Sequence, residues 1–424
     1  MRLPPRRWQI AGIAILAVLV AAGVLVIALV RSEGGGSGGE AVTIPAGDGV
    51  TLAAESFKPD GAGPHPLIVM PASWGNSATE YRLLAERFAA RGYVVVAYAQ
   101  RGFAGSSGEV DFAGAPTQHD ASAVIDWALA HTGADPHRIG MTGISYGAGI
   151  SLLAAERDPR IKAVVAMSAW TDLDASLVQN GTLSSRTLGA LLRTVENKGR
   201  PSKYANDLQA RLTSDPAGAA DLLRAREDVS SPIAHVAALN ANGTAVMIAN
   251  AWEDSIFPPA PLLRFYDALT TPKRLELAVG DHTTPELDGL FGRPDLTIGD
   301  AVAWFNHYLL GRPNGIDRAQ PIVLQDVRTR AWNGFTSWPN TLATTDLGAP
   351  GSADATAGSA PVSWSASLVT GTDTAATSGP PQYVEPIDYR PPTADLNVLA
   401  KNQHALVWSG PSEQSATTVS GVPS

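Results

Sequence analysis

Short apolar runs rich in β-branched residues alternate with helical patterns through the central part of the chain. The helical patterns fall at residues 81–90 and 121–131 and directly after Ser145. Each apolar run has the length and composition of a buried strand. Alternating strands and helices predict an α/β fold, a mostly parallel sheet with helices on both faces. The runs expected to form the sheet are AVTIPAGDGVTLAAESFKP from Ala41 (two strands), PLIVMPAS from Pro66, YVVVAYA from Tyr93, the run from Ile139 into Ser145, IKAVVAMSA from Ile161, TAVMIANAW from Thr244 and KRLELAVG from Lys273.

Two segments interrupt this alternation. Residues 171–235 contain amphipathic pieces and no strong strand, which predicts a helical cap inserted between two strands of the sheet. After residue 311, Thr, Ser, Pro and Gly dominate, and the short runs PIVLQDV and HALVWSG are typical of strands. We therefore expect an α/β domain at 41–315, with its cap, and a second, all-β domain at 316–424.

The N-terminal pattern predicts a membrane anchor. Residues 10–30 carry no polar side chain, and a helix of that length rises about 1.5 Å per residue and crosses the roughly 30 Å hydrocarbon core. Arg2, Arg6 and Arg7 precede the run, so the positive-inside rule places the rest of the chain outside the cytoplasm. Residues 1–40 are expected to comprise an uncleaved transmembrane helix and a Gly/Ser linker. A cleaved signal peptide, which leaves a secreted protein, and a twin-arginine signal are the alternatives.

Composition and charge narrow the class of function. Hydrophobic residues make up 45% of the 424 residues and charged residues 17%, enough apolar material for a large core. The formal net charge of -9 is spread along the chain and argues against nucleic acid as a partner, since phosphate binding needs a basic stripe. The absence of cysteine excludes disulfides, thiolate zinc sites and a cysteine nucleophile.

One pentapeptide carries the candidate chemistry. In Gly143-Ile144-Ser145-Tyr146-Gly147 a serine stands between two glycines where an apolar strand meets a helical pattern. Gly-x-Ser-x-Gly at that place is a nucleophile elbow, a turn so tight that small residues must flank the serine. Ligands of open parallel sheets bind beyond the carboxyl ends of the strands, where this hydroxyl would project. A serine hydroxyl is a poor nucleophile at neutral pH and needs a histidine and an acid.

An acid and a histidine follow the last two apolar runs. On this fold the order along the chain is Ser, acid, His, each after a later strand. Glu253-Asp254 and Asp281-His282 stand at those places. We expect His282 to be the base and Asp254 the acid. Glu253 remains an alternative acid, and Asp281 a weaker one, because it is too close in sequence to His282 to orient it easily.

The same end of the sheet offers residues for the oxyanion and the substrate. The backbone N–H of Tyr146, directly after the nucleophile, is one expected oxyanion donor. The loop at 71–75 is expected to supply the second, through the N–H of Trp74. Trp170 and Trp252 follow strands at this end and are candidates for lining an acyl pocket, although tryptophans are more often core residues. No metal or organic cofactor is implied.

Four motifs resemble the X-Pro dipeptidyl-peptidase and cocaine-esterase family of serine hydrolases, and the likeness covers most of the chain from residue 41 on. The resemblance implies an α/β-hydrolase fold with a helical cap before Ser231-Pro232 and favours Asp254 over Glu253. It also implies that the C-terminal segment is the start of a jelly-roll β-sandwich. The motifs are the elbow, the loop from Gln100-Arg101-Gly102 to Ser107-Gly108, the acid site Trp252-Glu253-Asp254 and the histidine loop Gly280-Asp281-His282.

Two features depart from the family pattern. Esterases of the family often place a tyrosine after the proline of the first oxyanion loop, but Ala72 stands there. A side-chain donor is therefore absent at that place, and a backbone donor is expected instead. The chain ends at Ser424, partway through the expected jelly roll, so this domain is expected to be incomplete, either a reduced version or part of a fragment.

Three hypotheses of function follow. The leading one is a membrane-anchored serine hydrolase outside the cytoplasm that cleaves a small carboxylic ester or amide through an acyl-enzyme at Ser145. The second is a dipeptidyl-peptidase that removes Xaa-Pro from peptides, which needs an anionic group such as Asp172, Asp174 or Glu196 to bind the substrate's amine. The third is a catalytically inactive hydrolase fold that binds a ligand at the cell envelope, and the intact triad argues against it. The sequence leaves the oligomeric state open.

Overall fold

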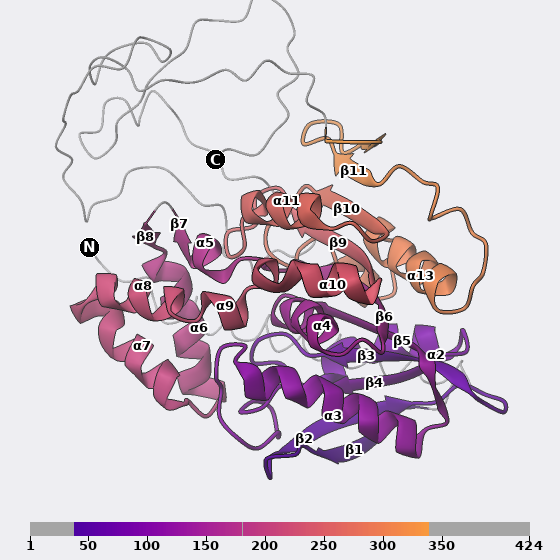
Figure 1. Cartoon of the computed structure of the whole chain (residues 1–424), viewed down its shortest axis with the longest axis horizontal. Coiled ribbons are helices and arrows are strands. Elements are labelled where there is room, and N and C mark those ends of the chain that lie inside the picture. The colour runs from indigo at the N-terminus through magenta and orange to yellow at the C-terminus, as the bar shows by residue number, and fades with distance from the viewer. Residues whose placement is uncertain (1–37, 180, 339–424) are drawn as a thin grey trace, which may run out of the picture. The chain divides into compact units, whose positions relative to one another are not determined.

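The computed structural model describes residues 38–179 and 181–338, and its centre is a ten-stranded sheet (Figure 1). The strand order is β1-β2-β4-β3-β5-β6-β9-β10-β11-β12. Neighbouring strands from β4 to β11 are parallel, and the pairs at the two edges are antiparallel. The strands are β1 (Glu40–Pro45), β2 (Thr51–Phe57), β3 (His65–Pro71), β4 (Val94–Tyr98), β5 (Ala134–Ile144), β6 (Ile161–Met167), β9 (Ala245–Ala251), β10 (Lys273–Ala278), β11 (Ile322–Gln325) and β12 (Trp332–Phe335).

Helices cover both faces of the sheet, which confirms the predicted α/β architecture. One face carries α3 (Ala115–His131), α4 (Tyr146–Arg157), α10 (Val236–Asn242) and α11 (Pro259–Ala268). The other carries η1 (Ala78–Tyr81), α2 (Arg82–Ala89) and α13 (Leu296–Tyr308), with the short α12 (Leu287–Leu290) beside them. Since both faces are covered, the central strands are buried on both sides and consist of continuous apolar runs.

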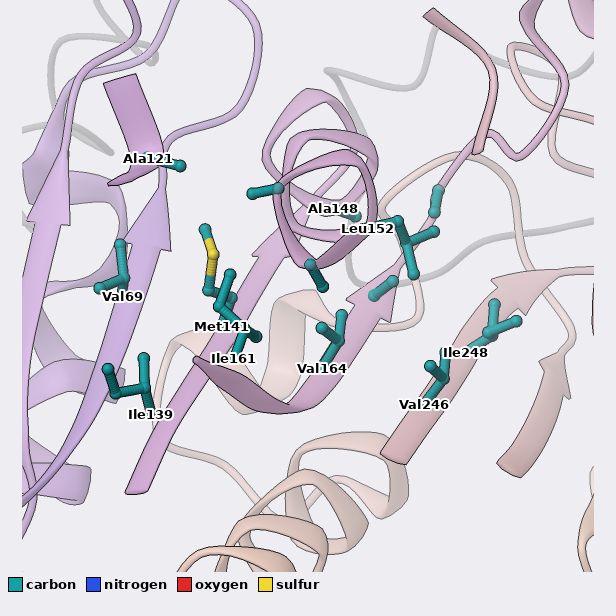
Figure 2. Close-up of a cluster of buried hydrophobic side chains, with 14 of the residues drawn as sticks. Val69, Ala121, Ile139, Met141, Ala148, Leu152, Ile161, Val164, Val246 and Ile248 are labelled. Carbon is teal, nitrogen blue, oxygen red and sulfur yellow. The ribbon is translucent and has the colours of Figure 1, made fainter. Parts of the chain in front are cut away.

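The alternation of side chains along β6 places α4, the helix that follows Ser145, on one face of the sheet. Successive side chains of a strand point to opposite faces, so Val164 packs in the cluster beneath α4 and Val165 in the cluster with α13. Figure 2 shows Val164 and Ile248 on the sheet below Leu152 of α4. This apolar contact holds α4 across the sheet, and the N-terminus of α4 lies at the carboxyl ends of the strands.

The segment between β6 and β9, where the cap is expected, folds mainly into helices. Helices α6, α7 and α8 lie together beside the sheet (Figure 1). The loop after β4 contributes Phe103 and Phe112 to their apolar cluster, which includes Leu188 and Leu192 and attaches the cap to the main domain. The elements are α5 (Leu173–Leu177), β7 (Val178–Gln179), β8 (Thr182–Leu183), α6 (Ser185–Lys198), α7 (Lys203–Ser214), α8 (Pro216–Arg224), α9 (Glu227–Ser230) and η2 (Pro232–His235).

Residues beyond 315 continue the main sheet. Strand β11 pairs in parallel with β10, and β12 pairs antiparallel with β11. The first part of the segment expected to form a second, all-β domain thus adds two strands to the α/β sheet. The rest of that segment, 339–424, lies outside the described residues, and its jelly-roll fold stays a prediction.

The transmembrane helix of the predicted fold class is not among the helices that the structure describes. Within 38–179 and 181–338, no helix is long and apolar enough to cross a membrane. The longest described helix, α3, has 17 residues and includes His119, Asp120 and Asp126, whereas a membrane span needs roughly 20 mostly apolar residues. The span expected at 10–30 lies outside the described residues. The location outside the cytoplasm stays a prediction.

Candidate active site

Ser145 occupies the sharp turn between β5 and α4. Its φ of 57° and ψ of -118° are a strained conformation for a residue with a side chain. The Ser145 N–H donates to the carbonyl oxygen of Met167 at 2.8 Å and so ties the turn to β6. A Cβ at Gly143 would overlap the backbone of Gly147, and a Cβ at Gly147 would overlap the Pro71 carbonyl oxygen. The turn therefore needs both glycines, as a nucleophile elbow requires.

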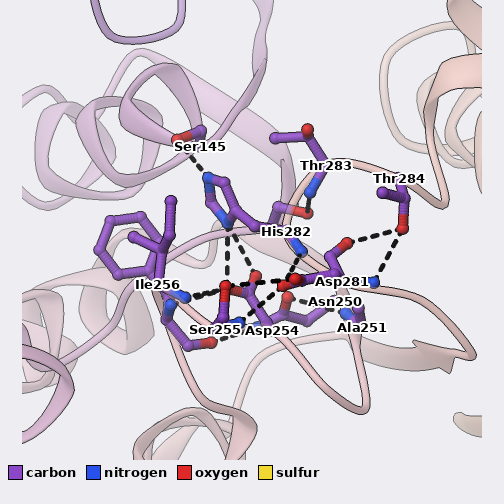
Figure 3. A network of polar contacts seen from close by, with 12 residues as sticks. Ser145, Asn250, Ala251, Asp254, Ser255, Ile256, Asp281, His282, Thr283 and Thr284 are labelled. Carbon is purple, nitrogen blue, oxygen red and sulfur yellow. Dashed lines mark hydrogen bonds and ion pairs between the residues drawn. The ribbon is translucent and has the colours of Figure 1, made fainter. Parts of the chain in front are cut away.

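Three side chains from three strand ends meet in a hydrogen-bonded row (Figure 3). His282 Nε2 lies 2.7 Å from Ser145 Oγ. On the other side of the ring, His282 Nδ1 lies 2.9 Å from Asp254 Oδ2 and 3.1 Å from Oδ1. All three residues are buried. The geometry joins a hydroxyl, an imidazole and a carboxylate in the order that proton transfer from serine to histidine needs.

The surroundings of His282 favour its protonated form. Burial alone disfavours a charged imidazole, but the negative charge of Asp254 and its hydrogen bond outweigh burial and raise the pKa of His282 above its ordinary value. Asp254 is held in turn, since its Oδ1 accepts the N–H groups of Ile256 at 2.9 Å and Phe257 at 2.7 Å. The carboxylate is thus held in position against the imidazole.

Neither of the two alternative acids, Glu253 and Asp281, hydrogen-bonds the imidazole of His282. Asp281 Oδ1 accepts the N–H groups of Ser255 at 2.8 Å and of His282 at 2.6 Å, so it joins the acid loop to the histidine loop. Glu253 Oε2 accepts the Gly280 N–H at 3.2 Å. Both carboxylates therefore shape the loops, and Asp254 is the acid that lies against His282.

Tyr146 and Trp74, the two residues expected to stabilise an oxyanion, line the same cavity as Ser145, and the role of their N–H groups stays a prediction. Tyr146 is the first residue of α4, and the N–H groups of the first helical turn have no partner within the helix. The ring of Trp74 packs edge-on against the Tyr146 ring at 4.7 Å, which brings the loop after β3 next to the elbow. Ala72, at the place of the family's tyrosine, is fully buried and donates its N–H to Tyr98. No side-chain donor comes from that position.

A small apolar cavity of about 30 Å³ adjoins Ser145. Trp170 is one of its walls, with its indole N–H donating to the Ser230 carbonyl oxygen at 2.7 Å. Trp252 does not line the cavity: its indole N–H donates to Gln325 at 2.9 Å and its ring packs against Trp338. The residues around the cavity are Trp74, Phe112, Ala113, Ser145, Tyr146, Trp170, Leu173, Leu177, Leu191 and Phe257.

Two buried residues next to the histidine loop were missed from sequence. Ser168 Oγ donates to Glu286 Oε1 at 2.9 Å and accepts the Thr283 N–H at 3.0 Å. The available signal was weak: Ser168 directly follows an apolar strand, and Glu286 stands four residues after His282. Within the described part of the chain, no cluster of three or more His, Cys, Asp or Glu side chains is arranged to hold a metal ion.

The ten-stranded sheet, the covering helices and the serine elbow define an α/β-hydrolase-like protein. The model of the X-Pro dipeptidyl-peptidase (S15) family matches residues 48–284, more than half of the 424 residues. The chain therefore belongs to this family of serine hydrolases, which confirms the family predicted from the motifs.

The chain is also similar to individual proteins. The chain is 25% identical over 396 residues to the cocaine esterase of Rhodococcus sp., covering 79% of this chain and 66% of that enzyme. It is 30% identical over 161 residues to an uncharacterised 31.7 kDa protein of Escherichia coli, covering 37% of this chain and 56% of that protein. These matches span about half to two thirds of the relatives' own length.

A solved structure shows the same fold. The crystal structure of a CocE/NonD family hydrolase from Staphylococcus aureus superimposes with a TM-score of 0.53 at 15% identity. The superposition covers 71% of this chain and 56% of that one. At this identity the likeness is one of fold alone.

Proposed function

We propose that the protein hydrolyses a small carboxylic ester or amide through an acyl-enzyme on Ser145. The observation that carries the proposal is the position of the His282 ring, with Nε2 2.7 Å from Ser145 Oγ and Nδ1 2.9 Å from Asp254. Those contacts suit a base that takes the serine proton while a carboxylate holds its tautomer. Membership of a serine hydrolase family supports the same reaction class.

The reaction has two halves. Ser145 Oγ attacks the carbonyl carbon of the substrate while His282 Nε2 takes the hydroxyl proton, and a tetrahedral oxyanion forms. The bond to the leaving group then breaks, and His282 gives its proton to the departing oxygen or nitrogen. Water attacks the resulting ester on Ser145, with His282 as base again. The carboxylic acid leaves, and the proton returns to Ser145.

The oxyanion is stabilised by backbone donors in this proposal. The N–H groups of Tyr146 and Trp74 are the expected pair, because one begins α4 and the other lies in the adjoining loop. A helix N-terminus also favours negative charge nearby. Removing one such donor typically lowers kcat by about 10² to 10³.

The cavity supports a small, uncharged acyl group. Its walls are aromatic and aliphatic apart from Ser145 itself, and its volume is only about 30 Å³. Such a pocket favours acetyl or similar acyl groups over long chains, since apolar pockets discriminate by size. The cap residue Leu191 closes one side, so longer acyl groups require the cap to move or to be trimmed.

Two observations support ester cleavage over removal of Xaa-Pro. The cavity walls include no carboxylate that would hold the free amine of a peptide. None of the acids considered for that role lines the cavity. Asp172 caps α5 through the Ala175 N–H at 2.8 Å, Asp174 lies 3.6 Å from Arg224, and Glu196 is exposed. Similarity to a cocaine esterase points the same way.

A direct assay of the full-length chain tests the proposal. p-Nitrophenyl acetate, butyrate and octanoate are compared with Gly-Pro-p-nitroanilide, using Ser145→Ala as the inactive variant. Ser151→Ala is the matched control, because Ser151 is also a buried serine, in the middle of α4, and its hydroxyl donates to the Gly147 carbonyl oxygen. Mass spectrometry after a short incubation locates the acyl group.

Rapid acetate cleavage that disappears in Ser145→Ala, with acetylated Ser145 and an active Ser151→Ala, is the expected result. Ser145-dependent cleavage of the anilide would replace the esterase by a dipeptidyl-peptidase. Folded protein that cleaves none of the probes and is not acylated would contradict the proposal and favour a binding role.

A further inference from the structure

The histidine loop rests on a second buried carboxyl that the triad does not use. Thr283, directly after His282, has a φ of 64°, and its N–H donates to Ser168 Oγ at 3.0 Å. Ser168 has a φ of 49°, and its hydroxyl donates to Glu286 Oε1 at 2.9 Å. The Ser168 hydroxyl thus links two residues in strained backbone conformations, Ser168 and Thr283, to the Glu286 carboxyl.

Glu286 is fully buried, and its second oxygen has no hydrogen-bond partner among the described residues. Burial is the main reason that the pKa of this carboxyl is raised to about 7, although Ser168 and the charge of His282 pull it down. A buried carboxyl without full hydrogen bonding is costly for folding alone. Its position beside the catalytic histidine suggests a use in the reaction.

The charged and titratable groups around Glu286 come from several elements. His282 lies in the same loop, and its positive form favours the carboxylate. Asp295, the N-cap of α13, disfavours it by like charge. Tyr81 of η1 is the neutral neighbour: burial and Glu80 are the larger causes that raise its pKa, and Glu286 adds to them. Within this set, the favourable electrostatic interaction of the Glu286 carboxylate is therefore with His282.

We propose that Glu286 and Ser168 are positioning residues for His282: the Glu286–Ser168–Thr283 link fixes the imidazole, and the carboxylate charge of Glu286 strengthens it as a base. The inference rests on the proposed function of His282. The imidazole becomes positive when it takes the Ser145 proton, and a carboxylate held nearby in a buried site stabilises that charge. Asp254 hydrogen-bonds the imidazole directly. Glu286 acts instead through its hydrogen-bonded link to the histidine loop and through the electrostatic effect of its charge.

The sign of the effect follows from the charges. The negative charge of Glu286 contributes to the raised pKa of His282, so Glu286→Gln is expected to lower that pKa. The histidine of the variant then loses its proton at lower pH, but it is a weaker base once neutral. A purely structural residue would lower the rate without moving the pH at which His282 titrates.

Two measurements on the full-length chain separate these roles. Histidine Cε1–H NMR follows the titration of His282, with His282→Gln used for assignment. The rate of Ser145 labelling by a fluorophosphonate, measured from pH 5 to 9, reports activation of the serine without a chosen substrate. The variants are Glu286→Gln and Ser168→Ala. The matched control is Glu156→Gln, another buried glutamate with a raised pKa, at the far end of α4.

Glu286→Gln is expected to lower the titration midpoint of His282 by roughly half a pH unit or more and the plateau labelling rate by about 3- to 10-fold. Ser168→Ala is expected to lower the plateau by a similar factor with a smaller change of midpoint, since the carboxyl stays. Glu156→Gln is expected to change neither.

An unchanged His282 midpoint in folded Glu286→Gln overturns the electrostatic part of the proposal. Unchanged labelling in Ser168→Ala overturns the positioning part, and it decides that point even if Glu286→Gln does not fold. Failure of the wild-type chain to label at Ser145 contradicts the proposed function instead. The NMR comparison then still decides whether Glu286 acts on His282.

Discussion

The hydroxyl of Tyr81 accepts the backbone N–H of Ile144, the residue before Ser145, at 2.9 Å. The carbonyl oxygen of Ile144 is held too, by the hydroxyl of Ser73 at 2.9 Å. Both groups come from the segment that follows β3, and all three residues are buried. Residues outside β5 and α4 therefore hold the backbone of the elbow in place. These two hydrogen bonds help to offset the strain of the Ser145 conformation.

Tyr81→Phe is expected to remove the hydrogen bond that holds the Ile144 N–H. The change leaves a buried N–H without an acceptor, which destabilises the fold by about 1–3 kcal/mol. Because the elbow is then free to shift, kcat is expected to fall about 10-fold or more. Thermal unfolding and ester kinetics measure the two effects. Tyr93→Phe is the control, since the Tyr93 hydroxyl bonds Asn306 Oδ1 at 3.1 Å away from the site, and it should lower stability without lowering kcat.

Asp254→Asn tests the cause of the raised pKa of His282. In the proposed reaction His282 must be neutral to accept the serine proton, so activity is expected to be lost as pH falls through its pKa. Because that pKa is raised by Asp254 against the effect of burial, the acid limb of kcat/KM in the wild-type protein is expected above about 6.5, the ordinary value for histidine. The variant should move the limb to lower pH and reduce the plateau by about 10³ to 10⁴.

Asp281→Asn provides the comparison for that experiment. Its carboxylate bonds backbone N–H groups of the two loops and does not bond the imidazole. Its loss should therefore lower the plateau much less than the loss of Asp254. A pH–rate profile in which both variants behave alike would contradict the assignment of Asp254 as the acid.

Alanine is expected to have opposite effects at two glycines, Gly147 of the elbow and Gly299 of α13. Gly147→Ala places a Cβ against the Pro71 carbonyl oxygen, which is backbone and cannot move aside easily. We expect loss of folded protein or of Ser145 labelling. Gly299, exposed in α13, has open space where a Cβ would stand. Gly299→Ala should raise the free energy of unfolding by about 0.5–1 kcal/mol, because alanine favours the helix, and denaturant unfolding checks both variants.

The structure brings Ser145, Asp254 and His282 together as the sequence predicts, and each of the three has a local signal, while their catalytic roles stay predictions. Gly-x-Ser-x-Gly identifies Ser145 because the turn excludes side chains at both glycines. Asp254 and His282 follow from chain order, since each stands directly after an apolar run that forms a strand. The alternation of strands and helices likewise predicts the layers of the fold.

The parts that sequence misses depend on contacts between distant segments. Ser168 and Glu286 are separated by 118 positions and meet only after the sheet forms. Trp252 follows a strand at the same end of the sheet as Ser145, yet its indole N–H donates to the Gln325 carbonyl oxygen of β11. Position at a strand end does not fix the direction of a side chain. The run at 322–325 has strand composition, but composition does not name its partner, which is β10.

Leu191→Ala tests whether the apolar cavity binds the acyl group. Leu191 is half-buried in α6 and lines the cavity beside Ser145. Its truncation removes a wall and makes room for a longer chain, so kcat/KM for the octanoate ester relative to the acetate should rise about 10-fold. The Trp74 indole bonds only the backbone oxygen of Leu191, at 3.1 Å, and keeps its partner. Leu222→Ala is the matched control, because Leu222 is also a half-buried cap leucine but lies outside the cavity lining. Equal chain-length preference in the two variants would mean that the acyl group binds elsewhere.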